Sequence, residues 1–597
     1  MDGVRIISVA GLIIAGCAVS NGQDNRLNNL VVEHVRATIQ PPADHDGSGP
    51  ARSFEFQSQR EGWVYLSLQS SGGPASASLD QPLVKKAILK ADGDGGGPAE
   101  AMRLVGPGRH TVHVFLDAAA GPAELRVRSI PEIMWFPITF ADWWMEASGR
   151  DWFYPKHEWD FIQKHLLPNG NALVFCHRPQ PFEKYIHALH ADGKLALMKE
   201  NIPHYDSTPD QIYDVWGRPL EELAYVDGMT IDEFGGGEQH QRLYPTWSEV
   251  LDRIAQNPAC KGKKIYAFTS SGGKPILPAI QRNNFRWLHE GYYMLGREED
   301  RGEYASYIQR YGGTLFEPIR ERFPGLIENN MLYTFGICDY QWAFDITPER
   351  DFNVFLDMQF HHIANHPSFA GMYGVCMYNL NQTTEQMARY AAALVRHYCI
   401  EGKKDRFNTN PLELEHLRNP SFEQGTADWQ ITPAGPDSVF AMDAAALPFK
   451  NEVSDRAIPN EKKVLCTVRS AQAPNVLSQR IANLKPGEYY SLQVMVCDLS
   501  DYGTTQLVPV SINLEGVEVV EDKSADRTWT NSFTNNEGPG QVSVCWNYRF
   551  RVFKARSSEA LLRLSDWAGP DSPGPAGRKM IWDFIQLQPF YADNDMP

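Results

Sequence analysis

The sequence predicts a multidomain protein of mixed α/β and all-β architecture, with a central (β/α)8 barrel between an N-terminal β-sandwich and a C-terminal β jelly roll. Three observations predict it. The chain has 597 residues, enough for about three or four domains. Strand-like and helix-like runs alternate over residues 131–404. The flanking segments 27–130 and 410–597 instead show short alternating runs broken by Gly, Pro and Ser.

Composition excludes several classes of protein. Hydrophobic residues make up 43% and charged residues 22%, as in ordinary globular proteins and unlike disordered or coiled-coil chains. Lys and Arg number 56 against 73 Asp and Glu, a formal net charge of −17. A surface with this much negative charge repels phosphate backbones, and we therefore expect no nucleic-acid partner. No motif with metal-ligand spacing stands at a strand end, and we expect neither a metal nor a cofactor.

Residues 1–22 predict a signal peptide. Arg5 precedes an apolar run of about ten residues, which suits a signal-peptide core and is too short to span a bilayer. The run ends in a stretch, 14–17, that resembles a bacterial lipobox, in which Cys17 would be lipidated after cleavage. The alternative is ordinary cleavage near Ser20. We expect a secreted, outer-surface or periplasmic protein that touches membrane only through an anchor at Cys17.

The segment 27–130 reads as a small β-sandwich. Its strand-like runs alternate apolar and polar residues and lack helical periodicity; they are 62–69, 85–91, 111–117 and 123–130. No catalytic constellation is evident in this part of the chain.

The middle segment predicts the barrel itself. Eight strands alternate with amphipathic segments within about 270 residues, which matches a parallel (β/α)8 barrel. An open doubly wound sheet is the alternative, but no GxGxxG or GxxxxGK[ST] follows a strand. The predicted strands are 133–140, 172–177, 195–199, 228–234, 264–269, 287–294, 331–337 and 373–379.

The C-terminal segment carries a resemblance. It opens with the run 419–425 (NPSFEQG) followed by Trp429, and it closes with the strand-like run 581–587 (IWDFIQL). This pattern resembles the jelly-roll carbohydrate-binding modules appended to bacterial polysaccharide-degrading enzymes. The resemblance implies a module that adds affinity for a polymer or serves only as structure.

Active sites of (β/α)8 barrels lie at the C-terminal ends of the strands. Polar and aromatic side chains cluster there, and an aromatic loop after the first strand could wall a sugar-binding cleft or plug the junction with the sandwich. The candidate substrate-binding residues are Asp142, Trp143, Trp144, His177, Arg178, Glu200, Asn201, Tyr292, Asp339 and Asn379.

The fourth strand carries the sharpest signal. Along 228–232 the residues alternate, so that Met229 and Ile231 face the helices while Asp232 points into the barrel at the end of the strand. Charged residues are rarely buried without a partner, which favours a functional Asp232. The alternative is a structural role, as a salt bridge to Arg178 or Lys199 or as a cap of the next loop.

Residues 227–232 (DGMTID) resemble the DG-x-x-[LI]-D motif on strand four of many barrel glycoside hydrolases. Chitinase-like barrels carry a Glu two residues after that Asp, where this chain has Phe234. In α-galactosidase-like barrels the strand-four carboxylate is the nucleophile and a strand-six carboxylate is the acid/base, a layout that Glu290 fits. A third group needs a Glu on strand seven, where only Asp339 could substitute.

These observations predict a secreted glycoside hydrolase acting on an extracellular polysaccharide or oligosaccharide through two carboxylates. Asp232 is the predicted nucleophile or charge stabiliser, Glu290 the general acid, and Glu233 the reserve for either role. The role of Glu290 depends on register: if Leu288 packs on the helices, Glu290 points away from the barrel interior. The alternative function is a non-catalytic surface glycan-binding protein with a degenerate barrel.

Overall fold

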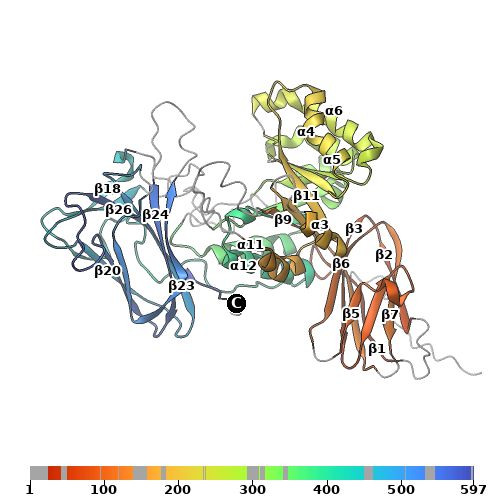
Figure 1. The fold of residues 1–597 in the computed structure, drawn as a ribbon, viewed down its shortest axis with the longest axis horizontal. Coiled ribbons are helices and arrows are strands. Elements are labelled where there is room, and N and C mark those ends of the chain that lie inside the picture. Colours follow the sequence, from red (N-terminus) through yellow and green to blue (C-terminus); the bar gives the residue numbers. More distant parts are fainter. Residues whose placement is uncertain are drawn as a thin grey trace, which may run out of the picture.

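The computed structural model has the three domains that the sequence predicts (Figure 1). It describes residues 25–41, 50–93, 96–117, 120–138, 157–176, 183–232, 234–235, 237–269, 271–291, 308, 316–339, 347–448, 462–503, 506–530, 545–592 and 596. The barrel lies between the N-terminal sandwich and the C-terminal jelly roll (Figure 1). Within these residues, no helix combines the length and apolar character needed to cross a bilayer.

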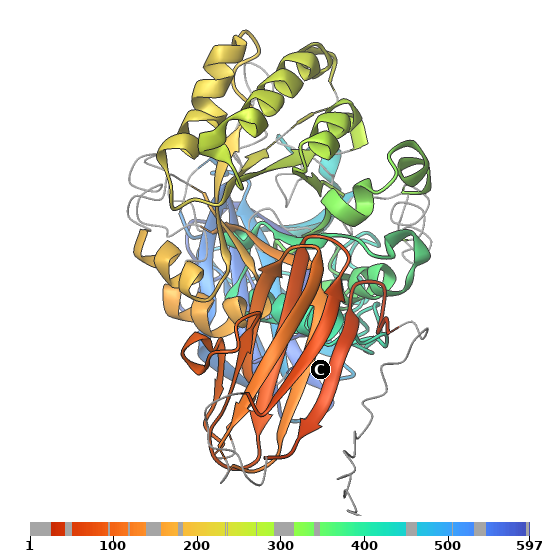
Figure 2. The same ribbon diagram turned by 90° about the vertical axis from the view of Figure 1, so that its right-hand side faces the viewer.

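The N-terminal domain is a sandwich of two four-stranded antiparallel sheets (Figure 2). A buried aliphatic core that includes Val64, Leu66 and Leu125 lies between the sheets. The predicted strand at 85–91 is shorter than expected, because a 3-10 turn, η1 (Val84–Lys86), occupies its first half. One sheet has the order β1 (Val32–Ile39), β8 (Ala123–Ile130), β3 (Gly62–Ser70), β6 (Ala99–Val105), and the other β2 (Arg52–Ser58), β7 (Gly108–Leu116), β4 (Ala75–Leu79), β5 (Leu89–Ala91).

The middle domain is a closed barrel of eight parallel strands, which confirms the predicted fold class. The strands fall where the sequence places them, because each is a short apolar run that is buried on both faces. In order round the barrel they are β9 (Glu132–Ile138), β10 (Ala172–Phe175), β11 (Leu195–Asn201), β12 (Gly228–Asp232), β13 (Lys264–Thr269), β14 (Arg286–His289), β15 (Met331–Gly336) and β16 (Gly374–Tyr378).

Helices surround the strands. The longest are α6 (Glu238–Gln256), α11 (Phe352–Asn365) and α12 (Glu385–Val395). The shorter described α-helices are α2 (Trp159–Phe161), α3 (Glu183–Ala191), α4 (Pro209–Trp216), α5 (Arg218–Glu222), α7 (Leu277–Arg282), α9 (Glu317–Arg322) and α10 (Leu326–Asn330). Single turns and π-turns complete the layer at η2 (Ile162–Leu166), η3 (Leu167–Asn169), η5 (Pro258–Cys260), η6 (Ser271–Ile276), η8 (Pro367–Phe369), η9 (Leu380–Gln382) and η10 (Arg396–Ile400).

Alternate strand residues form two separate apolar clusters. One cluster fills the barrel interior, and Phe136, Phe268 and Leu288 belong to it. The other lies between strands and helices and includes Met229, Ile231 and Trp287. A residue's parity along its strand therefore decides whether it faces the interior or the helices.

Pairing between neighbouring strands sets the height of each residue in the barrel. Following the Cα pairs once round the barrel returns to β12 eight residues nearer its start. This is the stagger of the (β/α)8 fold, and it amounts to one residue per strand. To find the residue at the same height on the next strand, from β12 to β13 to β14, one therefore takes the paired residue and moves one residue toward the C-terminus.

The C-terminal domain is a jelly roll of two antiparallel sheets around a separate apolar core. One sheet has the order β17 (Gln430–Thr432), β20 (Val476–Ile481), β25 (Ala560–Ser565), β22 (Ser511–Glu515). The other has the order β18 (Val439–Asp443), β19 (Lys463–Val468), β26 (Lys579–Pro589), β21 (Tyr489–Asp498), β24 (Cys545–Ala555), β23 (Val517–Thr530), and the 3-10 turn η11 (Ala444–Ala446) follows β18.

The sandwich is joined to the N-terminal end of the barrel by an ionic cluster. Glu61, in the turn before β3, accepts from Arg286 at 2.8 Å and lies 3.3 Å from Lys264. Both cations stand at the first residue of a barrel strand. Arg286 also donates to the Tyr373 hydroxyl at 2.6 Å and packs on its ring. Polar residues at this end of the barrel therefore connect two domains.

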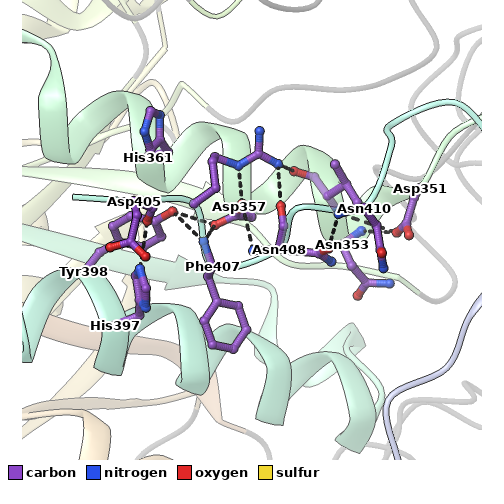
Figure 3. A network of polar contacts seen from close by, with 12 residues as sticks. Asp351, Asn353, Asp357, His361, His397, Tyr398, Asp405, Phe407, Asn408 and Asn410 are labelled. Carbon is purple, nitrogen blue, oxygen red and sulfur yellow. Dashed lines mark hydrogen bonds and ion pairs between the residues drawn. The ribbon is translucent and has the colours of Figure 1, made fainter. Parts of the chain in front are cut away.

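The jelly roll is joined to the barrel through the linker that follows η10 (Figure 3). Asp357 of α11 is fully buried and accepts hydrogen bonds from Tyr398, the Arg406 side chain and the backbone amides of 407 and 408. Asn408 in turn donates to the Tyr591 hydroxyl, beyond the last jelly-roll strand, at 2.7 Å. Both ends of the jelly roll are thus tied to the same two barrel helices.

Candidate active site at the C-terminal end of the barrel

Asp232 is the last residue of β12 and is only 5% exposed. It shares the parity of Gly228 and Thr230, opposite to Met229 and Ile231 in the outer cluster, so its side chain faces the barrel interior. Lys199 of β11 places its Nζ 2.8 Å from Asp232 Oδ2. The other oxygen, Oδ1, is buried and accepts no hydrogen bond from the described part of the chain.

Glu290 directly follows β14, and its backbone N–H donates to the Thr269 carbonyl at 3.0 Å. This bond continues the β13–β14 ladder by one residue. Leu288 belongs to the interior cluster and Trp287 to the outer one. Leu288 therefore does not pack on the helices, and the alternation of faces along β14 predicts that Glu290, one residue beyond the strand, faces the barrel interior.

The stagger of the barrel places Asp232 and Glu290 at the same height. By strand pairing, Asp232 corresponds to Phe268 on β13 and to Leu288 on β14. The stagger adds one residue for each strand crossed, so the residue at the height of Asp232 lies two positions after Leu288, at Glu290. Counting round the barrel in the same way puts Tyr378 of β16 and Cys176, just after β10, at this same height. Four interior positions from alternate strands make one layer, as is usual in this fold. We call these four residues the top layer.

The next layer down forms the floor of the site. It consists of Phe136, Lys199, Phe268 and Thr334, by the same count of register and stagger. The rings of Phe136 and Phe268 lie 5.8 Å apart, and Tyr378 packs on them at 5.4 and 4.8 Å. Two aromatic rings, those of Phe136 and Phe268, thus lie in the layer beneath the two carboxyl groups, and Tyr378 of the top layer packs on both.

Cys176 is the neutral member of the top layer. Burial raises the pKa of its thiol to about 12, with Lys199 opposing and Asp232 reinforcing the shift. The count of register and stagger puts the thiol in the same layer as Asp232. Since Cys176 stays protonated at neutral pH, it adds no negative charge to a layer that already contains two carboxyl groups.

His289 lies on the opposite face of β14 from Glu290. Its ring contacts Trp287, Phe316 and Tyr333 in the outer aromatic cluster. Burial lowers the pKa of this imidazole to about 3, because the apolar surroundings disfavour the charged ring. His289 is therefore a neutral packing residue rather than part of the cleft.

Asp339 follows β15 and is engaged by the start of α12. Its carboxylate accepts from the Thr384 amide at 2.8 Å and from the Thr384 hydroxyl at 2.5 Å. Burial raises its pKa to about 6, and these bonds oppose the shift. The geometry assigns Asp339 a helix-positioning contact; the predicted contact with substrate stays a prediction.

Asn379 follows the top-layer residue Tyr378 and has a left-handed backbone, with φ of 65°. The side chain is buried, and its Nδ2 donates to no acceptor within the described residues. Strained backbone and unpaired buried polar atoms are both concentrated at functional sites. This is consistent with the predicted role of Asn379 in substrate binding.

The two strand-three candidates differ in placement. Glu200 has the parity of Met198, which packs in the outer cluster, whereas Asn201 has the parity of Lys199. The Asn201 carbonyl accepts from the Trp216 indole at 3.2 Å. The remaining predicted site residues lie outside the described residues: Asp142, Trp143, Trp144, His177, Arg178, Glu233 and Tyr292.

Sequence reasoning named Lys199 only as a salt-bridge partner in the structural alternative for Asp232, and that ion pair is present; Cys176 and Tyr378 were not selected. A signal for each was present, since each has the parity of the interior residues of its own strand. Their convergence depended on the stagger between strands, which the sequence does not contain. Among the described residues, no cluster of three or more His, Cys, Asp or Glu side chains could hold a metal ion.

No protein-family model and no curated protein matches the chain. Solved structures that match include glycoside hydrolases and a carbohydrate-binding module. A GH2 β-galacturonidase from Eisenbergiella tayi is 10% identical, with a TM-score of 0.31, over 66% of this chain and all of that one. A calcium-binding mutant of Bacteroides uniformis β-glucuronidase 2 is 9% identical, with a TM-score of 0.32, over 94% and 80%.

The module TmCBM61, solved with β-1,4-galactotriose, is 18% identical, with a TM-score of 0.18, over 29% of this chain and 97% of that one. These matches do not identify a family.

Proposed function

We propose that the protein is a glycoside hydrolase that cleaves an extracellular polysaccharide or oligosaccharide, with Asp232 as nucleophile or charge stabiliser and Glu290 as general acid. The observation that carries the proposal is their shared place in the top layer, facing one interior at the C-terminal end of the barrel. Glycosidic cleavage needs one ionised and one protonated carboxyl on either side of the bond.

The spacing of the two residues suits this chemistry. Neighbouring strands lie about 4.8 Å apart, so the backbones of β12 and β14 are separated by roughly 10 Å. Glycosidases place their two carboxyl groups about 5–9.5 Å apart, so side chains that point inward from these two strands are compatible with the chemistry. The half-buried ring of Tyr378 in the same layer supports the proposal, because flat rings pack against the apolar faces of sugars.

The test is a reducing-end release screen of the purified protein on a broad panel of polysaccharides, with Asp232→Asn and Glu290→Gln alongside. We expect release from at least one substrate and its loss in both variants. Asp227→Asn is the matched control: Asp227 stands at the start of the same strand and bonds His190 at 2.8 Å, at the opposite end of the barrel. Equal activity of Glu290→Gln and wild type would transfer the acid role to Glu233 or Glu200.

The second candidate is a surface glycan-binding protein without catalysis. The jelly roll and the half-buried ring of Tyr378 fit this function as well as they fit hydrolysis. Retardation of the protein in polysaccharide-containing gels, with no sugar release on the whole panel, would favour it.

The place of action is proposed as outside the cytoplasm, with Cys17 as a lipid anchor. Partitioning of the wild type into membranes of the native host, lost in Cys17→Ala, would support the anchor. Equal partitioning of the two would exclude it.

A further inference from the structure

We propose that Lys199 is a positioning residue for Asp232, which holds Oδ2 from below and leaves Oδ1 free to meet the sugar. The inference rests on the proposed function of the Asp232 site and adds to it the group that orients the carboxylate.

The two residues belong to adjacent interior layers. Lys199 lies in the floor layer and Asp232 in the top layer, one residue of stagger higher on the neighbouring strand. Lys199 therefore reaches the carboxylate from a backbone position one layer below that of Asp232. The side chains are 25% and 7% exposed, so the 2.8 Å contact is shielded from bulk water.

An ion pair that serves only stability can pair both oxygens of its carboxylate, although Asp351, which caps α11, leaves Oδ2 without a partner within the described residues. Asp357, at the linker, shows what such a carboxylate looks like in this protein: both of its oxygens accept hydrogen bonds, from a hydroxyl, a guanidinium and two backbone amides. Asp232 Oδ1 has no such partner among the described residues, although it is equally hidden. Leaving a buried acceptor unpaired costs about 1–3 kcal/mol, more for a charged group. A substrate that bonds to Oδ1 explains why that arrangement persists.

The neighbours of the pair fit the same role. Cys176, in the same layer as Asp232, is uncharged at neutral pH. Lys199 thus puts a compensating positive charge next to Asp232 in a layer that also contains the Glu290 carboxyl. Because the charge comes from the neighbouring strand, it fixes the carboxylate direction without occupying the space above the layer.

The first test replaces the ammonium group and measures kinetics on the substrate found by the release screen. Lys199→Met should lower kcat about 100-fold with a small change in KM, because misplacing a reacting group by about 1 Å costs that much. Lys199→Ala should be rescued at least tenfold by propylammonium, which refills the space of the missing side chain. A kcat of Lys199→Met within threefold of wild type, or Lys199→Ala without amine rescue, would overturn the inference.

The matched control lies at the other end of the barrel. Lys264 also starts from an interior strand position and pairs with a carboxylate, Glu61, at 3.3 Å. Lys264→Ala should lose stability and keep its kcat, with no response to propylammonium. Equal kcat losses in the two alanine variants would mean that barrel integrity, and not the orientation of Asp232, is what Lys199 supplies.

A second measurement separates this inference from the proposed function. In a crystal structure of Lys199→Met, the Asp232 carboxylate should leave its wild-type orientation. An unchanged carboxylate would overturn the inference even if the enzyme is active. If the wild type neither cleaves nor binds any glycan, the proposed function fails, and the crystal structure still decides whether Lys199 orients Asp232.

Discussion

The two ends of the barrel carry similar residues and use them differently. At the N-terminal end, Arg286 and Lys264 point inward from strand starts and meet Glu61 of the sandwich. At the C-terminal end, Lys199 points inward and meets Asp232, whose second oxygen accepts no hydrogen bond from the described part of the chain. Another domain covers the first cluster, whereas the second lies where the βα loops begin. Ionic groups at one end therefore join domains, and those at the other lie where this fold places its active sites.

The largest expected effect belongs to the C-terminal end. Asp232→Asn should lower kcat by about 10³-fold or more, because it removes the charge that balances the developing oxocarbenium ion. The melting temperature should fall only modestly, since the Lys199 ammonium group loses its counter-charge but is partly exposed and keeps an amide oxygen as acceptor. Steady-state kinetics and thermal unfolding measure the two quantities. A clear loss of stability with unchanged kcat would mean that Asp232 is a structural residue like those at the other end.

Arg286→Met should show the opposite pattern. Arg286 is 1% exposed and binds Glu61 and Tyr373, so its removal leaves polar partners without their cation. We expect a loss of about 3–5 kcal/mol in the free energy of unfolding. The kcat of the folded fraction should be unchanged. Urea titration followed by activity measurement of the native protein checks both, and a large fall in kcat would show that the two ends are coupled.

Asp357→Asn tests the second domain junction. The NH2 group of Asn replaces one carboxylate oxygen and then faces hydrogen-bond donors, which it cannot accept from. We therefore expect a loss of about 2–3 kcal/mol in the free energy of unfolding and faster proteolysis of the linker at 405–410. Asp405→Asn is the control, because its exposed side chain leaves the His397 bond to the backbone carbonyl intact. Equal proteolysis of the two variants would show that Asp357 does not hold the linker.

The smallest expected effect concerns pH. The folded pKa of His289, about 3, lies below its unfolded value of about 6.5, so its stabilising contribution is present above pH 6.5 and is lost as pH falls toward 3. The loss amounts to about 1.4 kcal/mol per pH unit. His289→Phe, which fits the surrounding rings, should remove the contribution of His289 to the pH dependence of the free energy of unfolding between pH 6.5 and 5. Chemical denaturation at several pH values measures it, and parallel curves for wild type and variant would contradict the assignment.

The amino-acid sequence by itself determined the three domains, the eight strands and the inward direction of Asp232. Each depends on local order: apolar runs bounded by turn residues, and an alternation of faces that is fixed within one strand. Only the tertiary structure decided that Glu290 lies level with Asp232, that Lys199, one of the two cations that the sequence offered, pairs with the carboxylate, and that Glu61 comes from another domain to meet Arg286. These contacts depend on the register and stagger between strands, and inter-strand geometry is set by barrel closure rather than by any one segment of the chain.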